Sequence, residues 1–366
     1  MKITSIETFS TPGVALLRLT CESGASGWGQ IATTEAADIV ATCLHRQVAR
    51  VVIGREIDDH EKILDDVLHK NLKFPGSYIC RALAAVDTAL IDLRAKIAEQ
   101  PAWRFLASTP DPVAVYGSSM SRDITPRDEA ERMTRHRDES GYRAFKLRVG
   151  SWSGNDVDSW PGRTEELIPT VRAALGPDVT IHADANSCYS PARALEVGRM
   201  LEDNDYGHFE EPCPYWEYDW TKRVTAKLRI PVAGGEQDNY MPAWRYMITD
   251  HVVDIVQPDI CYVGGVTRTL KIARFAAEHG LLCTPHSANH SLVTVFTLAL
   301  RNALPNPGPF MEFSIEDQTN FRAMFTPALT VSDGVVKLPD EGYGWGVTIK
   351  PDWLERAEYR ITTADS

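Results

Sequence analysis

The sequence has no long apolar run and no patterned cysteines. No hydrophobic stretch approaches the roughly 20 residues that a membrane helix needs, so no transmembrane segment is expected. The seven cysteines are scattered and never form a CxxC pair, which argues against a zinc site or a disulfide framework. We interpret them as buried thiols in a reducing compartment. The N-terminal residues contain no apolar signal-peptide core, so we expect a cytoplasmic location.

Basic residues are also fewer than acidic residues. Lys and Arg total 38 against 50 Asp and Glu, and the net charge of −12 disfavours nucleic acid or an anionic membrane as the main partner. A small acidic substrate remains compatible with this charge, because the local charge at a metal site can outweigh the overall balance. The 366 residues are enough for two domains or for one large barrel with an accessory domain.

The first part of the chain combines strand and helix patterns. Residues 1–31 alternate as a β meander, with a turn at Glu22-Ser23-Gly24. Apolar residues then recur at three- and four-residue steps and indicate an amphipathic helix that stops before Pro101: Leu83, Val86, Leu90, Leu93 and Ile97. We therefore predict an α+β domain over residues 1–112.

From residue 113 onward, strand and helix patterns alternate. The predicted strands are Val113–Gly117, Ala144–Val149, Val179–Asp184, His208–Glu211, Pro231–Glu236, Val253–Gln257, Leu281–Pro285 and Phe310–Phe313. Predicted helices between them include Pro126–Asp138, Pro191–Glu202, Thr267–His279 and Leu292–Leu304. Eight such units predict a (β/α)₈ barrel over residues 113–325. Residues 326–366 do not continue this rhythm, and we expect them to return to the N-terminal domain.

Three acidic residues recur at one interval along this part of the chain. Asp184, Glu210 and Glu236 lie 26 residues apart, each at the end of a short apolar run. One βα unit takes roughly 25–30 residues, so the interval predicts three neighbouring strand ends on one face of the barrel. Each acid alone could instead cap the following helix, but the shared interval favours a cluster. An oxygen-only cluster suits Mg²⁺, and we expect one ion per subunit.

The neighbouring strands add groups that can move a proton. Asp259 and His286 are 27 residues apart, again one βα unit, so a carboxylate can orient an imidazole there. On the other side, alternation points Lys146 and Arg148 in the same direction, which we interpret as inward. A solvated basic strand end is the alternative. Two cations facing an Asp–His pair across a metal form a site for a carboxylate substrate whose enolate is stabilised.

The pattern resembles the mandelate racemase subgroup of the enolase superfamily. The similarity extends over nearly the whole chain, from Gly27-Trp28-Gly29 near its start to Trp345-Gly346 near its end. Its most specific motifs are Lys146-Leu147-Arg148, Asp184-Ala185-Asn186, Glu210-Glu211-Pro212, Gly235-Glu236, Asp259 and His286.

That resemblance implies an α/β fold, in which an α+β capping domain packs on a modified (β/α)₈ barrel. It also implies a reaction that begins by removing the proton α to a carboxylate. The implied roles are Mg²⁺ ligation by Asp184, Glu210 and Glu236, a catalytic Asp259–His286 dyad, and Glu312 as a hydrogen-bonding partner of the substrate carboxylate.

One position departs from the family pattern. Members with two bases usually carry Lys-x-Lys on the second barrel strand, whereas this chain has Arg148 there. A guanidinium cannot serve as a base near neutral pH, so racemisation is disfavoured. Lys146 could assist His286 if its pKa were depressed. We therefore favour an acid-sugar dehydratase, a lyase, with a racemase, epimerase or cycloisomerase as the alternative; an inactive metal-binding scaffold is a third hypothesis.

Other residues near these motifs have several possible roles. Asn186 follows Asp184 by two residues and could contact substrate or cap a helix. His290 is the histidine outside the dyad that best suits a substrate contact. Alternation turns Glu211 away from Glu210, so we expect it in a structural ion pair. The short loop at Ser10–Gly13 favours a polar, hydroxylated substrate. The expected partners are a small hydroxy-carboxylate and further copies of this chain.

Overall fold

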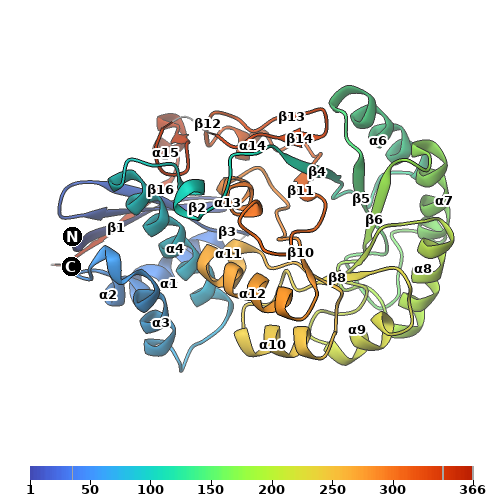
Figure 1. Ribbon diagram of the computed structural model, residues 1–366, viewed down its shortest axis with the longest axis horizontal. Helices are drawn as coiled ribbons and strands as arrows, with labels where there is room; N and C mark the ends of the chain where they lie inside the picture. The colour runs from blue at the N-terminus through green and yellow to red at the C-terminus, as the bar shows by residue number, and fades with distance from the viewer. Residues whose placement is uncertain (35, 340–341, 365–366) are drawn as a thin grey trace.

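The first residues of the chain form the predicted β meander. In the computed structural model, which describes residues 1–34, 36–339 and 342–364, the first three strands pair antiparallel in sequence order. They are β1 (Ile3–Thr11), β2 (Gly13–Cys21) and β3 (Ser26–Thr34). The helices that follow are α1 (Ala37–Cys43), the π-helical turn η1 (Leu44–Val48), α2 (Ala49–Val52), η2 (Ile57–Asp59), α3 (His60–Lys70), α4 (Ser77–Ile97) and α5 (Ala102–Phe105). Sheet and helices form the capping domain, which lies beside the barrel (Figure 1).

Glycines in β3 let the sheet approach α4 closely. A Cβ atom at Gly27 would lie 2.2 Å from the carbonyl oxygen of Ala89, and one at Gly29 would lie 2.0 Å from that of Ala85. Neither distance can accommodate a side chain, so the backbone of β3 packs directly on the helix. Further along β3, Gln30 donates to Ser291 Oγ at 2.8 Å. The capping domain therefore contacts the barrel near its strand ends.

The barrel follows the predicted alternation. Its parallel strands in the described residues are β4 (Val113–Ser118), β5 (Ala144–Arg148), β6 (Thr180–Asp184), β7 (Phe209–Glu210), β8 (Val232–Gly234), β9 (Ile255–Val256), β10 (Leu282–Cys283) and β11 (Met311–Ser314). Each of β4 to β9 pairs with the next strand, and β11 pairs with β4. No ladder joins β10 to β11 in the described ranges. The predicted α/β fold, a capping domain with a barrel-like parallel domain, is confirmed.

Helices connect these strands on the outside of the barrel (Figure 1). They are α6 (Pro126–Ser140), α7 (Arg163–Leu175), α8 (Pro191–Asp203), α9 (Tyr218–Thr225), α10 (Met241–Thr249), α11 (Ile260–Val263), α12 (Val266–Glu278) and α13 (Leu292–Arg301). Two of them begin with a side-chain cap followed by proline: Thr125 caps α6 and Ser190 caps α8. Among the described residues, none of the helices combines the length and apolar character of a membrane span.

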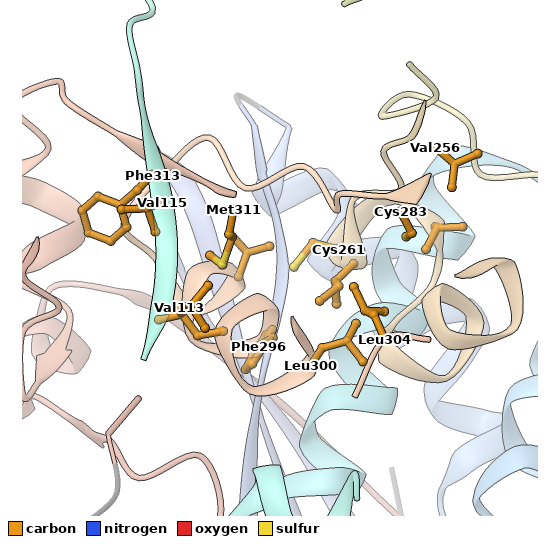
Figure 2. Packing of buried hydrophobic residues seen from close by; sticks show 14 of the residues in the cluster. Val113, Val115, Val256, Cys261, Cys283, Phe296, Leu300, Leu304, Met311 and Phe313 are labelled. Carbon is orange, nitrogen blue, oxygen red and sulfur yellow. The ribbon is translucent and has the colours of Figure 1, made fainter. Parts of the chain in front are cut away.

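Apolar side chains fill the junction between the first and last barrel strands. Figure 2 shows Val113 and Val115 of β4 near Met311 of β11 and Phe296 of α13. All four are buried in the larger apolar cluster, which continues through the barrel. A second cluster fills the capping domain between its sheet and α1, α3 and α4. The strand ends that carry the polar residues are therefore supported from below and from the side by packed apolar residues.

The C-terminal segment reaches the capping domain later than residue 326. Its hairpin β13 (Val331–Ser332) and β14 (Val335–Val336) pairs with the start of β4 and so extends the barrel sheet. The start of β4 is free on that side because β5 pairs only with its last two residues. The remaining elements are α14 (Thr319–Arg322), β12 (Phe325–Thr326), β15 (Thr348–Ile349), α15 (Pro351–Glu355) and β16 (Glu358–Thr363).

Two contacts tie the end of the chain to the capping domain. The backbone N–H of Trp345 donates to Asp92 Oδ1 at 2.9 Å, and that of Trp28 donates to Oδ2 at 2.7 Å. Strand β16 then pairs antiparallel with β1. These contacts support our proposal that the tail belongs to the capping domain, and we propose that the boundary lies after the β13–β14 hairpin.

Candidate active site

Three carboxylates meet at neighbouring strand ends. Asp184 and Glu210 are the last residues of β6 and β7 and pair in register, and Glu236 follows β8 by two residues. One carboxylate oxygen from each lies within 4.8 Å of those from the other two, and all three side chains are buried. This all-oxygen set fits a divalent cation, whose charge would offset the repulsion among the carboxylates. The cluster therefore forms as the 26-residue interval predicts.

Strand β5 places Lys146 among these carboxylates. Its Nζ contacts Glu210 Oε1, lies 2.9 Å from Glu312 Oε1 and lies 3.6 Å from Asp184 Oδ2. Burial opposes the ammonium charge, but Glu210 and Glu312 outweigh it and raise the pKa of Lys146 above its ordinary value. These contacts favour Lys146 as a charged hydrogen-bond donor.

Arg148 faces the same interior, as strand alternation predicts. Its Nε donates to the carbonyl oxygen of Ser119 at 2.9 Å, and its Nη1 donates to Asn186 Oδ1 at 2.9 Å and contacts Asp184. Asn186 donates in turn to Asp184, from its backbone N–H to Oδ1 at 2.7 Å and from Nδ2 to Oδ2 at 3.2 Å. Asn186 therefore orients a metal-site carboxylate, and the cap of the following helix α8 is Ser190.

Asp259 and His286 meet on the opposite wall. Oδ2 of Asp259 lies 2.8 Å from Nδ1 of His286. The other carboxylate oxygen of Asp259 accepts the backbone N–H groups of Cys261 at 2.7 Å and Tyr262 at 3.1 Å, at the start of α11. One side chain thus caps a short helix and fixes the imidazole. Nε2 of His286 lies 3.3 Å from Glu236 Oε2, on the side of the metal cluster.

Glu312 lies between the two walls. Its Oε1 accepts from Ser118 Oγ at 2.7 Å, and its Oε2 accepts from the backbone N–H of Ser287 at 2.9 Å. Burial opposes ionisation, but Lys146 and His286 outweigh it and lower the pKa of Glu312 to about 2. Burial lowers the pKa of His286, but the charges of Glu236 and then of Glu312 outweigh burial and raise this pKa to about 10. The interior is therefore a network of alternating charges.

Glu211 does not make the ion pair that we expected. It is buried, Ser187 Oγ donates to its Oε2 at 3.5 Å, and no ion pair involves it in the described parts of the chain. Its φ of 41° breaks the strand alternation on which the prediction depended. Burial, followed by the charges of Glu236 and Glu210, raises the pKa of Glu211 well above its ordinary value. A neutral carboxylic acid fits these surroundings.

Both ring nitrogens of His290 are occupied by the protein. Nε2 lies 2.9 Å from the carbonyl oxygen of Ser314, and Nδ1 accepts from Arg322 Nε at 2.8 Å. Burial, and then the Arg322 charge, lower the pKa of His290 to about 4. These contacts favour a neutral, structural ring, and a direct contact between His290 and substrate stays a prediction.

Two further histidines lie close to the strand ends that carry Asp184 and Glu210. His182 and His208 precede Asp184 and Glu210 by two residues each, and their rings stack with centroids 3.8 Å apart and 9° between planes. Burial lowers the pKa of both rings. Stacked, buried rings in the barrel interior favour a structural role for both histidines.

Two residues at the site were not singled out from the sequence. Gln257 Nε2 donates to Glu210 Oε2 at 2.7 Å; its position two residues before Asp259 was a usable signal, because both lie at one strand end. Arg122 Nη2 donates to Asn186 Oδ1 at 2.6 Å from the loop between β4 and α6. That loop carries no spacing signal, so only the structure brings Arg122 to the site.

Both parts of the chain match known family models. Residues 2–107 match the mandelate racemase / muconate lactonizing enzyme, N-terminal domain, and residues 128–353 match the enolase C-terminal domain-like family. D-galactarolactone cycloisomerase of Agrobacterium fabrum is 31% identical over 94% of this chain and 91% of its own length. Arabinonate dehydratase of Saccharolobus solfataricus is 26% identical over 92% of this chain and 88% of its own.

Solved structures extend the similarity to three dimensions. A provisionally assigned racemase from Roseobacter denitrificans is 51% identical, with a TM-score of 0.96 over 99% of this chain and 100% of its own. A mandelate racemase/muconate lactonizing protein from Paracoccus denitrificans PD1222, complexed with magnesium, is 30% identical, with a TM-score of 0.90 over 100% of this chain and 99% of its own.

Proposed function

The chain belongs to the enolase superfamily, in its mandelate racemase/muconate lactonizing subgroup, and from this premise we propose that it dehydrates an acid sugar, an aldonate or an aldarate. The product would be a 2-keto-3-deoxy acid. The observation that carries the proposal is the asymmetry of the site. His286 Nε2 faces the carboxylate cluster from one wall, whereas Lys146 and Arg148 on the other wall are cations. Such a site supports proton removal from one face of the substrate.

In the proposed reaction, Nε2 of His286 takes the proton from the carbon α to the substrate carboxylate. The C–O bond at the β carbon then breaks, and the departing hydroxyl receives the proton from His286 and leaves as water. The resulting enol tautomerises to the keto acid. Asp259 holds the ring in one tautomer throughout, because its Oδ2 lies 2.8 Å from Nδ1.

Asp184, Glu210 and Glu236 would hold one Mg²⁺, whose charge would stabilise the negative charge that develops on the substrate carboxylate and offset the pull of Glu236 on the His286 proton. Lys146 and Arg148 donate hydrogen bonds on the opposite side of the substrate. A guanidinium donates hydrogen bonds and is not a proton acceptor in ordinary enzyme chemistry, so Arg148 serves as a donor rather than a base. We also propose Glu312 as a hydrogen-bonding partner of the substrate.

The test is product formation from a panel of aldonic and aldaric acids with Mg²⁺, followed by the semicarbazone absorbance of 2-keto acids. We expect keto acid from at least one member of the panel, and none from the His286→Asn variant. If every acid that exchanges its α-proton in D₂O gives no keto acid, the dehydratase proposal fails.

Cycloisomerisation of an acid-sugar lactone is the second candidate. It also needs proton transfer on one face, which this site offers, and a relative with 31% identity is a D-galactarolactone cycloisomerase. Racemisation fits the site less well, because it needs a base on each face and Arg148 occupies the second position. Ring-opened or rearranged lactone in the ¹H NMR spectrum, without keto acid, would favour the cycloisomerase.

A further inference from the structure

Arg122 carries a buried charge that the protein leaves without a counter-ion. Only 6% of the residue is exposed, the same fraction as for Glu236 and His286. Among the described residues, no carboxylate pairs with it, and its Nε and Nη1 have no hydrogen-bond partner. Burial, and then repulsion from Arg148, lower the pKa of Arg122 to about 9. A buried guanidinium with free donors is costly unless an anion joins it.

Arg122 and Arg148 share one acceptor. Oδ1 of Asn186 receives Nη2 of Arg122 at 2.6 Å and Nη1 of Arg148 at 2.9 Å. Arg148 also contacts Asp184 of the metal cluster, whereas Arg122 reaches the cluster through Asn186. Along this wall, Asp184 is therefore followed by Arg148 and then by Arg122. The two adjacent guanidinium groups therefore share one neutral oxygen, and an anionic group beside them would offset their repulsion.

A tryptophan from the neighbouring loop covers this charge. The guanidinium carbon of Arg122 lies 4.3 Å from the centroid of the Trp152 ring. Trp152 itself is 73% exposed and belongs to the irregular segment 149–162 between β5 and α7. Because the ring has few packing contacts to lose, displacing it would uncover Arg122 without disturbing the barrel core.

We propose that Arg122, together with Arg148, binds a second carboxylate of the substrate, so that the enzyme prefers dicarboxylic acid sugars to monocarboxylic ones. This inference rests on the proposed function, in which the carboxylate next to the reacting carbon lies at the metal cluster. Asn186 lies between Arg122 and that cluster, so we place Arg122 at the opposite end of the substrate. A monocarboxylic acid sugar ends there in a hydroxymethyl group and leaves the guanidinium charge unpaired.

The test compares matched pairs of acids on Arg122→Met, Arg122→Lys and a control, Arg127→Met. The side chain of Arg127 on α6 is 78% exposed, and its ion pairs are with Asp128 and Glu131 of the same helix. Binding of galactarate and D-galactonate, and of D-glucarate and D-gluconate, is measured by calorimetry with Mg²⁺ present. Steady-state kinetics follow for every acid that is turned over.

For the acid pair that fits the site, the wild type should bind the diacid at least about 10-fold more tightly than the monoacid, since a hydrogen-bonded charge pair has that strength. Arg122→Met should weaken diacid binding by about 10- to 100-fold and change monoacid binding less than about 2-fold. Arg122→Lys keeps the charge but not the planar donor pair, so it should lie between these values. Arg127→Met should match the wild type.

Equal weakening of both acids would overturn the proposal, because Arg122 would then bind the carboxylate that both share. Unchanged diacid binding, or a wild type without preference in either pair, would overturn it as well. If only the dehydratase proposal fails, no acid yields keto acid. The wild type then still binds the diacid more tightly, and Arg122→Met still loses this preference. Thermal melting checks each fold, and if Arg122→Met does not fold, a full diacid preference in Arg122→Lys overturns the proposal.

Discussion

Nδ1 of His286 lies 2.8 Å from Oδ2 of Asp259, across two neighbouring strand ends of the barrel. The contact holds one ring nitrogen against a carboxylate that is itself fixed by two backbone N–H groups. The other ring nitrogen is thereby directed toward Glu236, 3.3 Å away. This relationship separates an orienting role from a proton-transfer role, and the two can be tested separately.

Replacing His286 by Asn should lower turnover by at least about 10³-fold, within the range of a positioned acid/base. Asp259→Asn should cost less, because the imidazole remains but loses its fixed tautomer. Steady-state kinetics on a confirmed substrate measure both effects, and calorimetric Mg²⁺ binding should stay unchanged in both variants. Normal dehydration by His286→Asn would move the proton transfer to Lys146.

Glu236→Gln should abolish tight Mg²⁺ binding, whereas Glu211→Gln should preserve it. Both side chains are buried to the same extent, but Glu236 belongs to the carboxylate cluster with Asp184 and Glu210, and the cluster does not include Glu211. Titration of each protein with Mg²⁺ by calorimetry distinguishes them. Equal losses in the two variants would show that Glu211 also ligates the ion.

Arg148→Met should reduce kcat/KM by about 10²-fold, because one charged hydrogen-bond donor to the substrate is lost. Arg148→Lys should recover only part of this loss, since an ammonium cannot reproduce the two parallel donors of a guanidinium. Arg127→Met serves as the surface control. A wild-type rate of α-proton exchange in Arg148→Met would leave Arg148 without the role that we assign.

His290 should make stability depend on pH. Its folded pKa is about 4 against an ordinary value of 6.5, so the unfolded chain takes up a proton between these values while the folded protein does not. Stability is therefore complete above pH 6.5 and falls as pH drops toward 4, by about 2 kcal/mol at pH 5. Urea unfolding at pH 7 and pH 5 measures this loss.

His290→Gln is the matched control for that measurement. A glutamine amide can donate to the Ser314 carbonyl and accept from Arg322, yet it does not titrate. The difference in unfolding free energy between pH 7 and pH 5 should shrink by about 2 kcal/mol in this variant. An unchanged difference would mean that the ring is protonated in the folded protein.

The strand ends were predictable because two regularities reinforce each other there. The βα period spaces Asp184, Glu210 and Glu236 equally, and strand alternation gives Lys146 and Arg148 a common direction. Both depend on local chain geometry, which a sequence displays directly. The cluster and the Asp259–His286 contact therefore form as expected.

The positions of residues outside the regular strands and helices of the barrel could not be predicted in this way. Glu211 follows β7 immediately, but its backbone enters the left-handed region, so alternation gives the wrong direction. Arg122 comes from a loop whose path depends on tertiary packing. The β13–β14 hairpin pairs with β4 more than 200 residues away in sequence, at an edge that exists only after the barrel has formed.

The pairing of β16 with β1 also has a consequence for how the molecule is made. The final strand of the chain completes the sheet that the first strand begins. During synthesis, one edge of β1 therefore stays unpaired until the entire barrel has left the ribosome. Such an edge can recruit strands from other chains. A nascent chain that stops before residue 358 leaves this edge of β1 unpaired, and pairing with β16 covers the edge.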